Sequence, residues 1–139
     1  MVGAAYRYFR QNAVKDAQIA VISSIAGTKG LGAAPAYSAT KRMQNCYIQS
    51  LAQQCAITKT DIAFTDIRPG FVATPLLDTQ THHYPMLMST PYAARRIVRA
   101  ILARRRVAVI DWRYAILVAV WRCIPRWLWE RLPIKAAEK

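Results

Sequence analysis

Residues 19–23 read IAVIS, a continuous apolar run of strand length, and this stretch decides the fold. A strand without polar alternation is typical of a buried parallel sheet, whose two faces are both covered. Two further strand-like runs follow it, DIAFTDI (61–67) and VAVI (107–110). The sequence therefore predicts about three buried, parallel strands.

Helical segments separate the predicted strands. Residues 2–13 precede the first strand, and a long helix of about 36–57 follows its glycine-rich loop. A further helix, 92–106, follows Pro91, a residue that a first helical turn tolerates well. This alternation of helix and strand is typical of a doubly wound parallel sheet. We expect an α/β fold with right-handed crossovers.

Composition indicates a folded and strongly basic protein. The 139 residues are 54% hydrophobic and carry a net charge of +13. This length allows one core but is short for a complete α/β enzyme. Three cysteines without CxxC spacing favour a reducing compartment. The sequence lacks a signal-peptide pattern and the roughly 20-residue apolar run of a spanning helix. We therefore expect a cytoplasmic protein.

Tyr37 and Lys41 form the first chemical signal. They are four residues apart, so they lie on one face of the predicted helix 36–57. An ammonium group beside a phenol stabilises the phenolate form, which makes Tyr37 a usable general acid or base. The spacing alone is a weak signal, because such pairs arise by chance.

The ends of two predicted strands add to this signal. Ser24 ends the IAVIS strand, and Pro69-Gly70 ends the next one, 32 residues after Tyr37. Open α/β sheets bind ligands at the carboxyl ends of their strands. Pro69-Gly70 also interrupts regular secondary structure, which leaves backbone N–H groups and the Thr74 hydroxyl available to a ligand. We expect a ligand site at this edge of the sheet.

Three spaced motifs carry a family resemblance. ISSIAG (22–27), YSATK (37–41) and IRPGFVATP (67–75) resemble the short-chain dehydrogenase/reductase family in order and spacing, and the resemblance covers about residues 2–111. It implies a Rossmann-type sheet, of which this chain would form the C-terminal half. The implied domains are a partial Rossmann-like domain, 1–112, and a helical tail, 113–139.

The resemblance implies a role for each matching residue. Tyr37 would be the catalytic acid/base, Lys41 would assist it and hold the nicotinamide ribose, and Ser24 would orient the substrate carbonyl or alcohol. Ser23 would be only a strand-end hydroxyl. The implied cofactor-binding residues are Tyr37, Lys41, Pro69, Gly70, Val72 and Thr74.

The implied reaction is hydride transfer between NAD or NADP and a small-molecule carbonyl/alcohol pair, with NADP slightly favoured and no metal. The family's phosphate-binding turn, TGxxxGxG, has no counterpart here. The loop 26–32 lies where the family has a substrate-side loop, so we expect its glycines to give backbone freedom. We expect a truncated enzyme. The alternative is an inactive fragment or pseudoenzyme that acts through binding or through its basic tail.

Partners follow partly from the resemblance and partly from the tail. The family often pairs through the helices represented by 2–13 and 36–57, which suggests a homo-oligomer. Residues 113–132 are expected to form one or two helices interrupted at Pro125 and combine tryptophan with arginine. This composition suits peripheral contact with an anionic membrane, or apolar cover for the sheet or a partner subunit. Nucleic acid is disfavoured, because no binding motif accompanies the charge.

The loop 75–91 contains two further pairs of interest. His82 and His83 are predicted to be solvated loop residues and not metal ligands or catalytic groups. Met86 and Met88 either line an apolar substrate pocket or pack into the core, and the sequence favours neither.

Overall fold

The computed structural model describes residues 1–75, 77 and 83–134. Its centre is a three-stranded parallel sheet in the order β1 (Ala17–Ile22), β2 (Ile62–Arg68) and β3 (Val107–Val109). The α/β fold with three parallel strands is thus confirmed. Within the described residues β1 pairs only with β2, so its other edge is open there.

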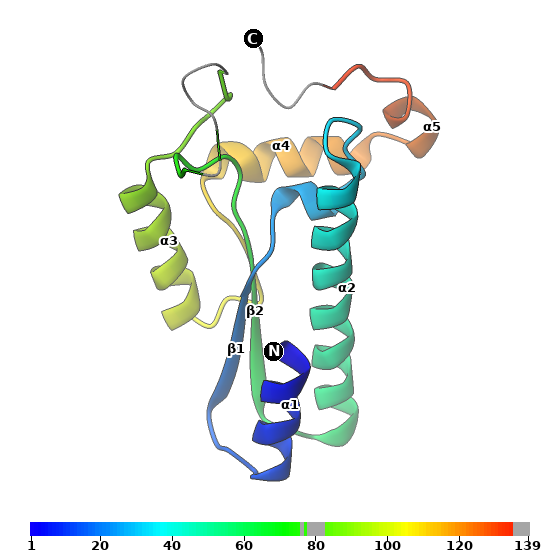
Figure 1. Ribbon diagram of the computed structural model, residues 1–139. Coiled ribbons are helices and arrows are strands. Elements are labelled where there is room, and N and C mark those ends of the chain that lie inside the picture. The colour runs from blue at the N-terminus through cyan, green and yellow to red at the C-terminus, as the bar shows by residue number, and fades with distance from the viewer. Residues whose placement is uncertain (76, 78–82, 135–139) are drawn as a thin grey trace.

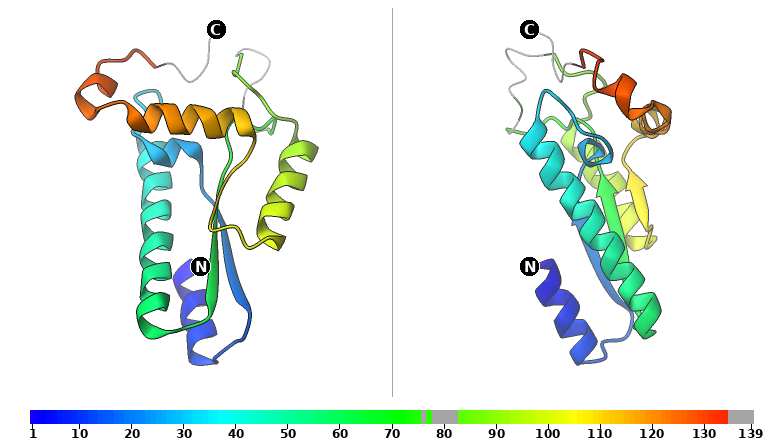
Figure 2. Two further views of the ribbon diagram at one scale, coloured as in Figure 1. Left: turned by 180° about the vertical axis from the view of Figure 1, so that it is seen from behind. Right: turned by 90° about the vertical axis from the view of Figure 1, so that its right-hand side faces the viewer.

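Helices cover the sheet on both faces and at one end. α1 (Val2–Gln11) and α2 (Pro35–Thr58) lie on one face, α3 (Thr90–Leu102) lies on the other, and α4 (Trp112–Cys123) runs across the carboxyl ends of the strands (Figures 1 and 2). Two short elements are also helical, the 3-10 turn η1 (Ile25–Thr28) and α5 (Arg126–Trp129). In the described part of the chain, no helix combines the length and apolar character needed to span a bilayer.

The long helix α2 has clear local signals at both ends. Pro35 occupies its first turn, where the missing N–H is not needed. Lys59 takes a left-handed conformation, with φ 53°, and closes the last turn. Asn45, Ile48 and Cys55 fall on the buried face. The helix therefore presents its N-terminal turn at the carboxyl edge of the sheet.

β2 joins the two hydrophobic clusters of the protein. Ile62 and Phe64 pack with α1, β1 and α2 in the first cluster. Ile67, which is fully buried, packs with β3 and α4 in the second cluster. Parallel register places Phe64 beside Ile19 and Ile67 beside Ala108. The central strand thereby connects both halves of the core.

The predicted helix 92–106 is wrong at its C-terminal end. α3 ends at Leu102, and Arg104 takes a positive φ of 49°. The carbonyl of Arg106 already accepts a hydrogen bond from the Asp66 N–H at 3.0 Å. Sheet pairing thus competes for this arginine run and overrides its helix propensity. The predicted helix break at Pro125 is confirmed between α4 and α5.

Candidate active site

The structure brings the predicted site residues to the carboxyl ends of β1 and β2. Ser24 is the second residue after β1, Pro69 follows β2 directly, and Tyr37 lies in the first turn of α2. The Pro69 carbonyl accepts the Ile25 N–H at 3.1 Å and the Ser24 hydroxyl at 3.4 Å. These bonds hold the ends of the two strands together.

Tyr37 and Lys41 are neighbours in space as well as in sequence. The Lys41 ammonium lies 5.5 Å from the centroid of the Tyr37 ring. It also donates to the carbonyl of Ile22, the last residue of β1, at 3.2 Å. The Tyr37 side chain is 46% exposed. The phenol is therefore accessible to a ligand, while the ammonium beside it is held against the strand end.

Ser24 is buried and serves the local backbone. Its hydroxyl accepts the Ala26 N–H at 3.1 Å and caps η1. In the described part of the chain it makes no hydrogen bond to Tyr37 or Lys41. Its donated bond to Pro69 is long, and a bond of 3.4 Å holds the hydroxyl proton weakly. The proton can therefore turn toward a different acceptor.

Ser38 fixes the start of α2, and the sequence analysis did not single it out. Its buried hydroxyl lies 2.7 Å from the Ala26 carbonyl and 2.8 Å from the Lys29 carbonyl, and it accepts the Leu31 N–H at 3.2 Å. These contacts hold the loop 26–31 against the first turn of α2. Ser38 adjoins Tyr37, so it sets where the phenol is presented. Its place within YSATK was the only available signal.

Gly27 is required by close packing. A Cβ atom there would lie 2.7 Å from the backbone carbonyl carbon of Lys41. No glycine of the chain has a positive φ, so the conformational freedom expected of the loop glycines is not used. Gly30 and Gly32 would meet nothing within 4 Å. Gly27 instead allows η1 to pack closely against α2 at Lys41, the residue that donates to the carboxyl end of β1.

Tyr114 of α4 supports the segment after β2. Its ring fills the space where a Cβ of Gly70 would stand, with ring carbons 2.2–2.4 Å from that position. Its hydroxyl accepts the Phe71 N–H at 3.0 Å and donates to the Pro85 carbonyl at 3.0 Å. Burial raises the pKa of Tyr114, which favours the neutral hydroxyl. Sequence reasoning missed this residue, although Gly70 signals a close approach.

Beyond Gly70 the chain runs beside the loop that precedes α3. Val72 forms an isolated parallel bridge with Met88, and the Ala73 N–H donates to the Met88 carbonyl at 2.9 Å. Met88 is buried in the second cluster, and Met86 packs against it, so both methionines pack into the core. Thr74 is half-buried just after this bridge.

The predicted loop histidines fall on and beside undescribed residues. His83 is exposed, as predicted, whereas His82 lies outside the described residues. In the part of the chain that the structure describes, no group of three or more His, Cys, Asp or Glu side chains is placed to hold a metal ion.

A buried carboxylate lies behind the strand ends. Asp66 accepts a short hydrogen bond from the Ser23 hydroxyl and forms an ion pair with Arg68 at 2.6 Å. Both Asp66 and Ser23 are buried. A buried charge needs such partners. Ser23 is therefore a strand-end hydroxyl, as predicted, and it ties β1 to β2 below the site.

The exposed donors suit one end of a nicotinamide cofactor. Among the described residues, the partly exposed Lys41 donates one of its three N–H groups to the Ile22 carbonyl and makes no hydrogen bond with the other two. The Tyr37 phenol is exposed on the same side of the helix. An ammonium and a phenol side by side match the two neighbouring hydroxyls of a ribose. The residues present therefore fit the nicotinamide ribose.

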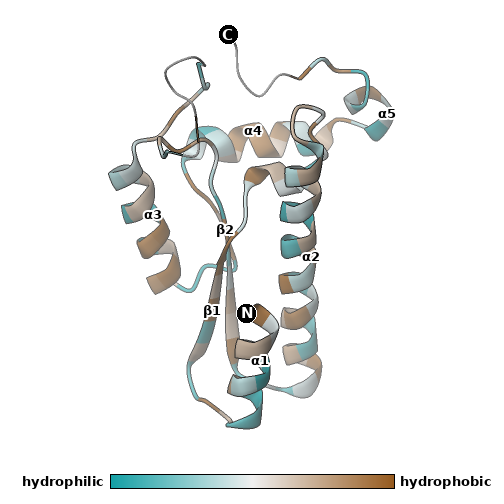
Figure 3. Cartoon of the chain, viewed as in Figure 1, coloured by the Kyte–Doolittle hydropathy of each residue, from teal (hydrophilic) through white to brown (hydrophobic). Residues whose placement is uncertain are grey.

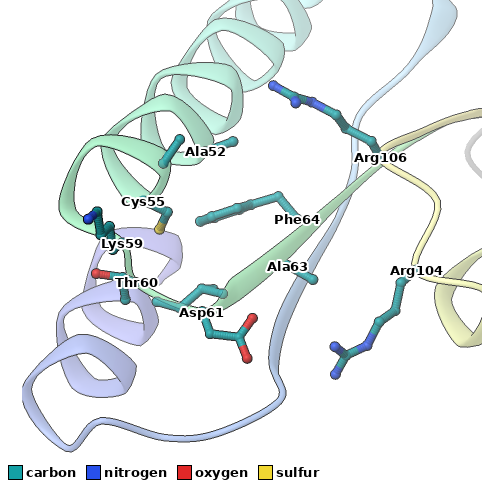
Figure 4. A pocket seen from close by; sticks show the side chains of 11 residues that line it. Ala52, Cys55, Lys59, Thr60, Asp61, Ala63, Phe64, Arg104 and Arg106 are labelled. Carbon is teal, nitrogen blue, oxygen red and sulfur yellow. The ribbon is translucent and has the colours of Figure 1, made fainter.

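A pocket of about 470 Å³ lies away from these residues. It opens at the amino end of β2, between Cys55, Phe64 and Arg106 (Figure 4). The predicted site lies at the opposite, carboxyl end of the same strand. A smaller hollow of about 240 Å³ is lined by residues 30–32 and by Trp129 and Ile134 of the tail. Neither pocket contains Tyr37 or Lys41.

Comparison with known proteins agrees with this geometry. The family model described as short chain dehydrogenase matches residues 1–85. Uncharacterized oxidoreductases of Myxococcus xanthus and Mycobacterium tuberculosis are each 28% identical, over 84% and 83% of the chain. The chain spans 45% of the length of either relative.

A solved structure gives the same result for the fold. A protein described as a short-chain dehydrogenase, from Novosphingobium aromaticivorans, superposes with a TM-score of 0.63 at 16% identity. The match covers 96% of this chain and 44% of that one. The family model, which extends over more than half of the chain, and the shared fold lead to one conclusion: the chain belongs to the short-chain dehydrogenase family.

Proposed function

We propose that the protein is an NAD(P)-dependent oxidoreductase that interconverts a carbonyl and an alcohol. The observation that supports this most directly is the Tyr37–Lys41 pair. The phenol is exposed, and the ammonium lies beside it at the carboxyl end of β1. The type of reaction is inferred from the family, whereas the donation and positioning of the proton are assigned to residues of this chain.

Each residue has a distinct part in the proposed reaction. Tyr37 gives a proton to the carbonyl oxygen in reduction and takes it back in oxidation. Lys41 stabilises the phenolate and holds the ribose hydroxyls with its remaining N–H groups. Ser24 turns its weakly held proton from Pro69 toward the substrate oxygen. Positioning of the two reacting groups is a main contribution of such a site.

The cofactor supplies the hydride when it is bound. Pro69, Gly70, Val72 and Thr74 would lie beside the nicotinamide, with Gly70 and Phe71 held by Tyr114. The loop 26–32 between β1 and α2 is rich in glycine, but it stands where the family has its substrate-side loop and not its pyrophosphate-binding turn. We propose that in a protein of its relatives' length the pyrophosphate-binding turn comes from outside the 139 residues, together with the choice between NAD and NADP.

Two tyrosines of the same helix allow a matched test. Tyr37→Phe removes the proposed acid, whereas Tyr47→Phe removes a phenol of similar exposure nearly three helical turns away. We expect Tyr37→Phe to lower NADPH oxidation with a panel of ketones and aldehydes by about 10²- to 10⁴-fold. Tyr47→Phe should keep the rate of the unmodified protein, and circular dichroism should show the same fold for both.

Binding and turnover are separated by a second measurement. Saturation-transfer NMR with NADPH should show contact at the nicotinamide ribose, and Lys41→Ala should remove it. Equal rates for Tyr37→Phe and Tyr47→Phe would contradict the proposal. Binding without turnover of any carbonyl would instead favour the alternative of an inactive form that acts by binding.

A further inference from the structure

α4 is apolar on both of its faces. Tyr114, Val118 and Trp121 face inward and are buried in the second cluster. Trp112, Ile116 and Val120 face outward and are 64%, 56% and 59% exposed. Their spacing of four residues places them along one side of the helix. A helix on the surface of a water-soluble domain usually has a polar outer face.

α5 adds further exposed apolar residues beyond the end of α4, and contacts of Trp129 hold it in place. Trp129 donates to the Gly30 carbonyl at 2.6 Å and packs edge-on against Trp121, with ring centroids 5.6 Å apart. These contacts hold the inner side of α5 against the loop after η1. Trp127 and Leu128 remain outside, 61% and 37% exposed. We define the outer face of α4–α5 as the exposed residues Trp112, Ile116, Val120, Trp127 and Leu128. Much of α4 is coloured as hydrophobic in Figure 3.

The charges around this outer face are almost all positive. Residues 112–134 contain four arginines and a single carboxylate, Glu130. Arg126 pairs with Glu130 at 2.6 Å, and Arg131 stacks over Trp127 with its guanidinium 5.8 Å from the ring centroid. Arg113 and Arg122 flank α4 near its two ends, and Arg113 is paired with the buried Asp111 just before the helix. A complementary partner must therefore be apolar at its centre and negatively charged around it.

An anionic lipid surface has this chemistry. Tryptophan settles at the level of the lipid headgroups, aliphatic side chains enter the acyl region, and arginines contact phosphates. A second copy of this chain fits poorly, because each copy carries +13 and would repel the other. We propose that the outer face of α4–α5 docks the protein on an anionic bilayer.

Docking in this orientation has a consequence for the candidate site. The inner side of α4 contacts Gly70 and Phe71 through Tyr114, and the helix crosses the carboxyl ends of the strands (Figure 1). The edge that carries Tyr37 would therefore lie close to the lipid surface. Membrane docking itself does not depend on the proposed oxidoreductase activity, and its test requires no turnover.

The test compares two double variants of the full chain. Ile116→Glu with Val120→Glu places charges in the outer face of α4–α5. Ile57→Glu with Leu102→Glu makes the same change at exposed apolar residues, 75% and 79% exposed, at the ends of α2 and α3. Binding is measured by co-sedimentation with vesicles of phosphatidylglycerol and phosphatidylcholine, with pure phosphatidylcholine vesicles and vesicle-free samples as references.

We expect the unmodified chain to bind the anionic vesicles and not the pure phosphatidylcholine vesicles. The outer-face double variant should lose at least tenfold in apparent affinity, whereas the control double variant should bind as the unmodified chain does. Tryptophan fluorescence should shift to shorter wavelength on binding. Equal loss in both double variants would show attraction by net charge alone and overturn the proposal. Absence of binding would also overturn it, as would a dimer in light scattering that only the outer-face variant disrupts.

Discussion

At the scale of single residues, Gly70 and Tyr114 show how closely the site is built. The glycine follows the Pro69 break, and the tyrosine comes from a helix that begins 42 positions later in the chain. The ring lies flat against the glycine and leaves no space for a side chain. The position of the segment 69–74 therefore depends on one aromatic ring of α4.

Gly70→Ala should destabilise the protein. The new Cβ would stand 2.2–2.4 Å from ring carbons of Tyr114, and that ring is 1% exposed and cannot move into solvent. Overpacking of this kind typically costs about 1–3 kcal/mol. Urea denaturation gives the free energy of unfolding. Gly32→Ala is the control, because a Cβ there meets nothing within 4 Å and should change stability by less than about 0.5 kcal/mol.

This comparison is specific because neither glycine has a positive φ. Both substitutions then have the same small effect on backbone entropy, and they differ only in whether the new Cβ atom meets a neighbouring side chain. Equal stability of the two variants would mean that Tyr114 does not pack on Gly70 in solution.

At the scale of elements, α4 depends on the cap at its N-terminus. The Asp111 carboxylate accepts the Arg113 N–H at 2.9 Å and pairs with the Arg113 guanidinium at 2.9 Å. Asp111 is buried and has a φ of 76°, a region that few residues other than glycine adopt. The cap thus holds the strained residue through which β3 turns into α4.

The same cap makes stability depend on pH. The hydrogen bond from the Arg113 side chain lowers the pKa of Asp111, despite an opposing effect of burial. A carboxylate with a lowered folded pKa contributes stability that is complete above its ordinary pKa of about 4. That contribution is lost as the pH falls through the lowered value. Acid should therefore weaken the attachment of α4.

We expect the free energy of unfolding to fall less steeply below about pH 5 in Asp111→Asn than in the unmodified chain. Asparagine still caps a helix and tolerates positive φ, but it does not titrate. Urea denaturation from pH 7 to pH 3 measures the slope. Asp61→Asn is the control, since that exposed side chain makes no hydrogen bond or ion pair among the described residues. Identical acid slopes for the two variants would exclude Asp111 as the source.

At the scale of the whole molecule, β2 contributes buried residues to both clusters and connects them, so we expect them to unfold together. Ile67 is fully buried in the second cluster, and Ile48 of α2 is 4% exposed in the first. All four tryptophans lie between Trp112 and Trp129, so fluorescence reports on the second cluster. Far-ultraviolet circular dichroism reports on all helices and strands. The two signals together test whether the clusters unfold jointly.

Ile67→Val should lower stability by about 0.5–1.5 kcal/mol, the usual cost of one buried methylene. The fluorescence and circular dichroism transitions should shift to the same lower midpoint. The two transitions should also coincide in Ile48→Val, although that substitution lies in the first cluster. Coincident transitions are the mark of two-state unfolding. If Ile48→Val left the midpoint of the fluorescence transition unchanged, the two clusters would unfold separately.

The local order of the chain could be predicted from sequence to a large extent. Apolar runs of strand length at 19–23, 61–67 and 107–110 became β1, β2 and β3 with shifts of one or two residues. Pro91 and Pro125 marked element boundaries correctly. Such patterns depend on neighbours within a turn or a strand, so sequence contains their physical cause. The roles of Ser24, Tyr37 and Lys41 remain predictions, although the structure places them at one edge.

Long-range packing decided the rest. The ring of Tyr114 against Gly70, the Trp129 bond to Gly30, and the early end of α3 all depend on residues far apart in the chain. Hydrophobic burial is non-directional, so an apolar run reveals that a helix packs but not where it packs. Sequence alone determined the parallel sheet and the residues at its carboxyl edge. Only the tertiary structure decided that α4 crosses this edge, with one apolar face on the candidate site and the other in contact with solvent.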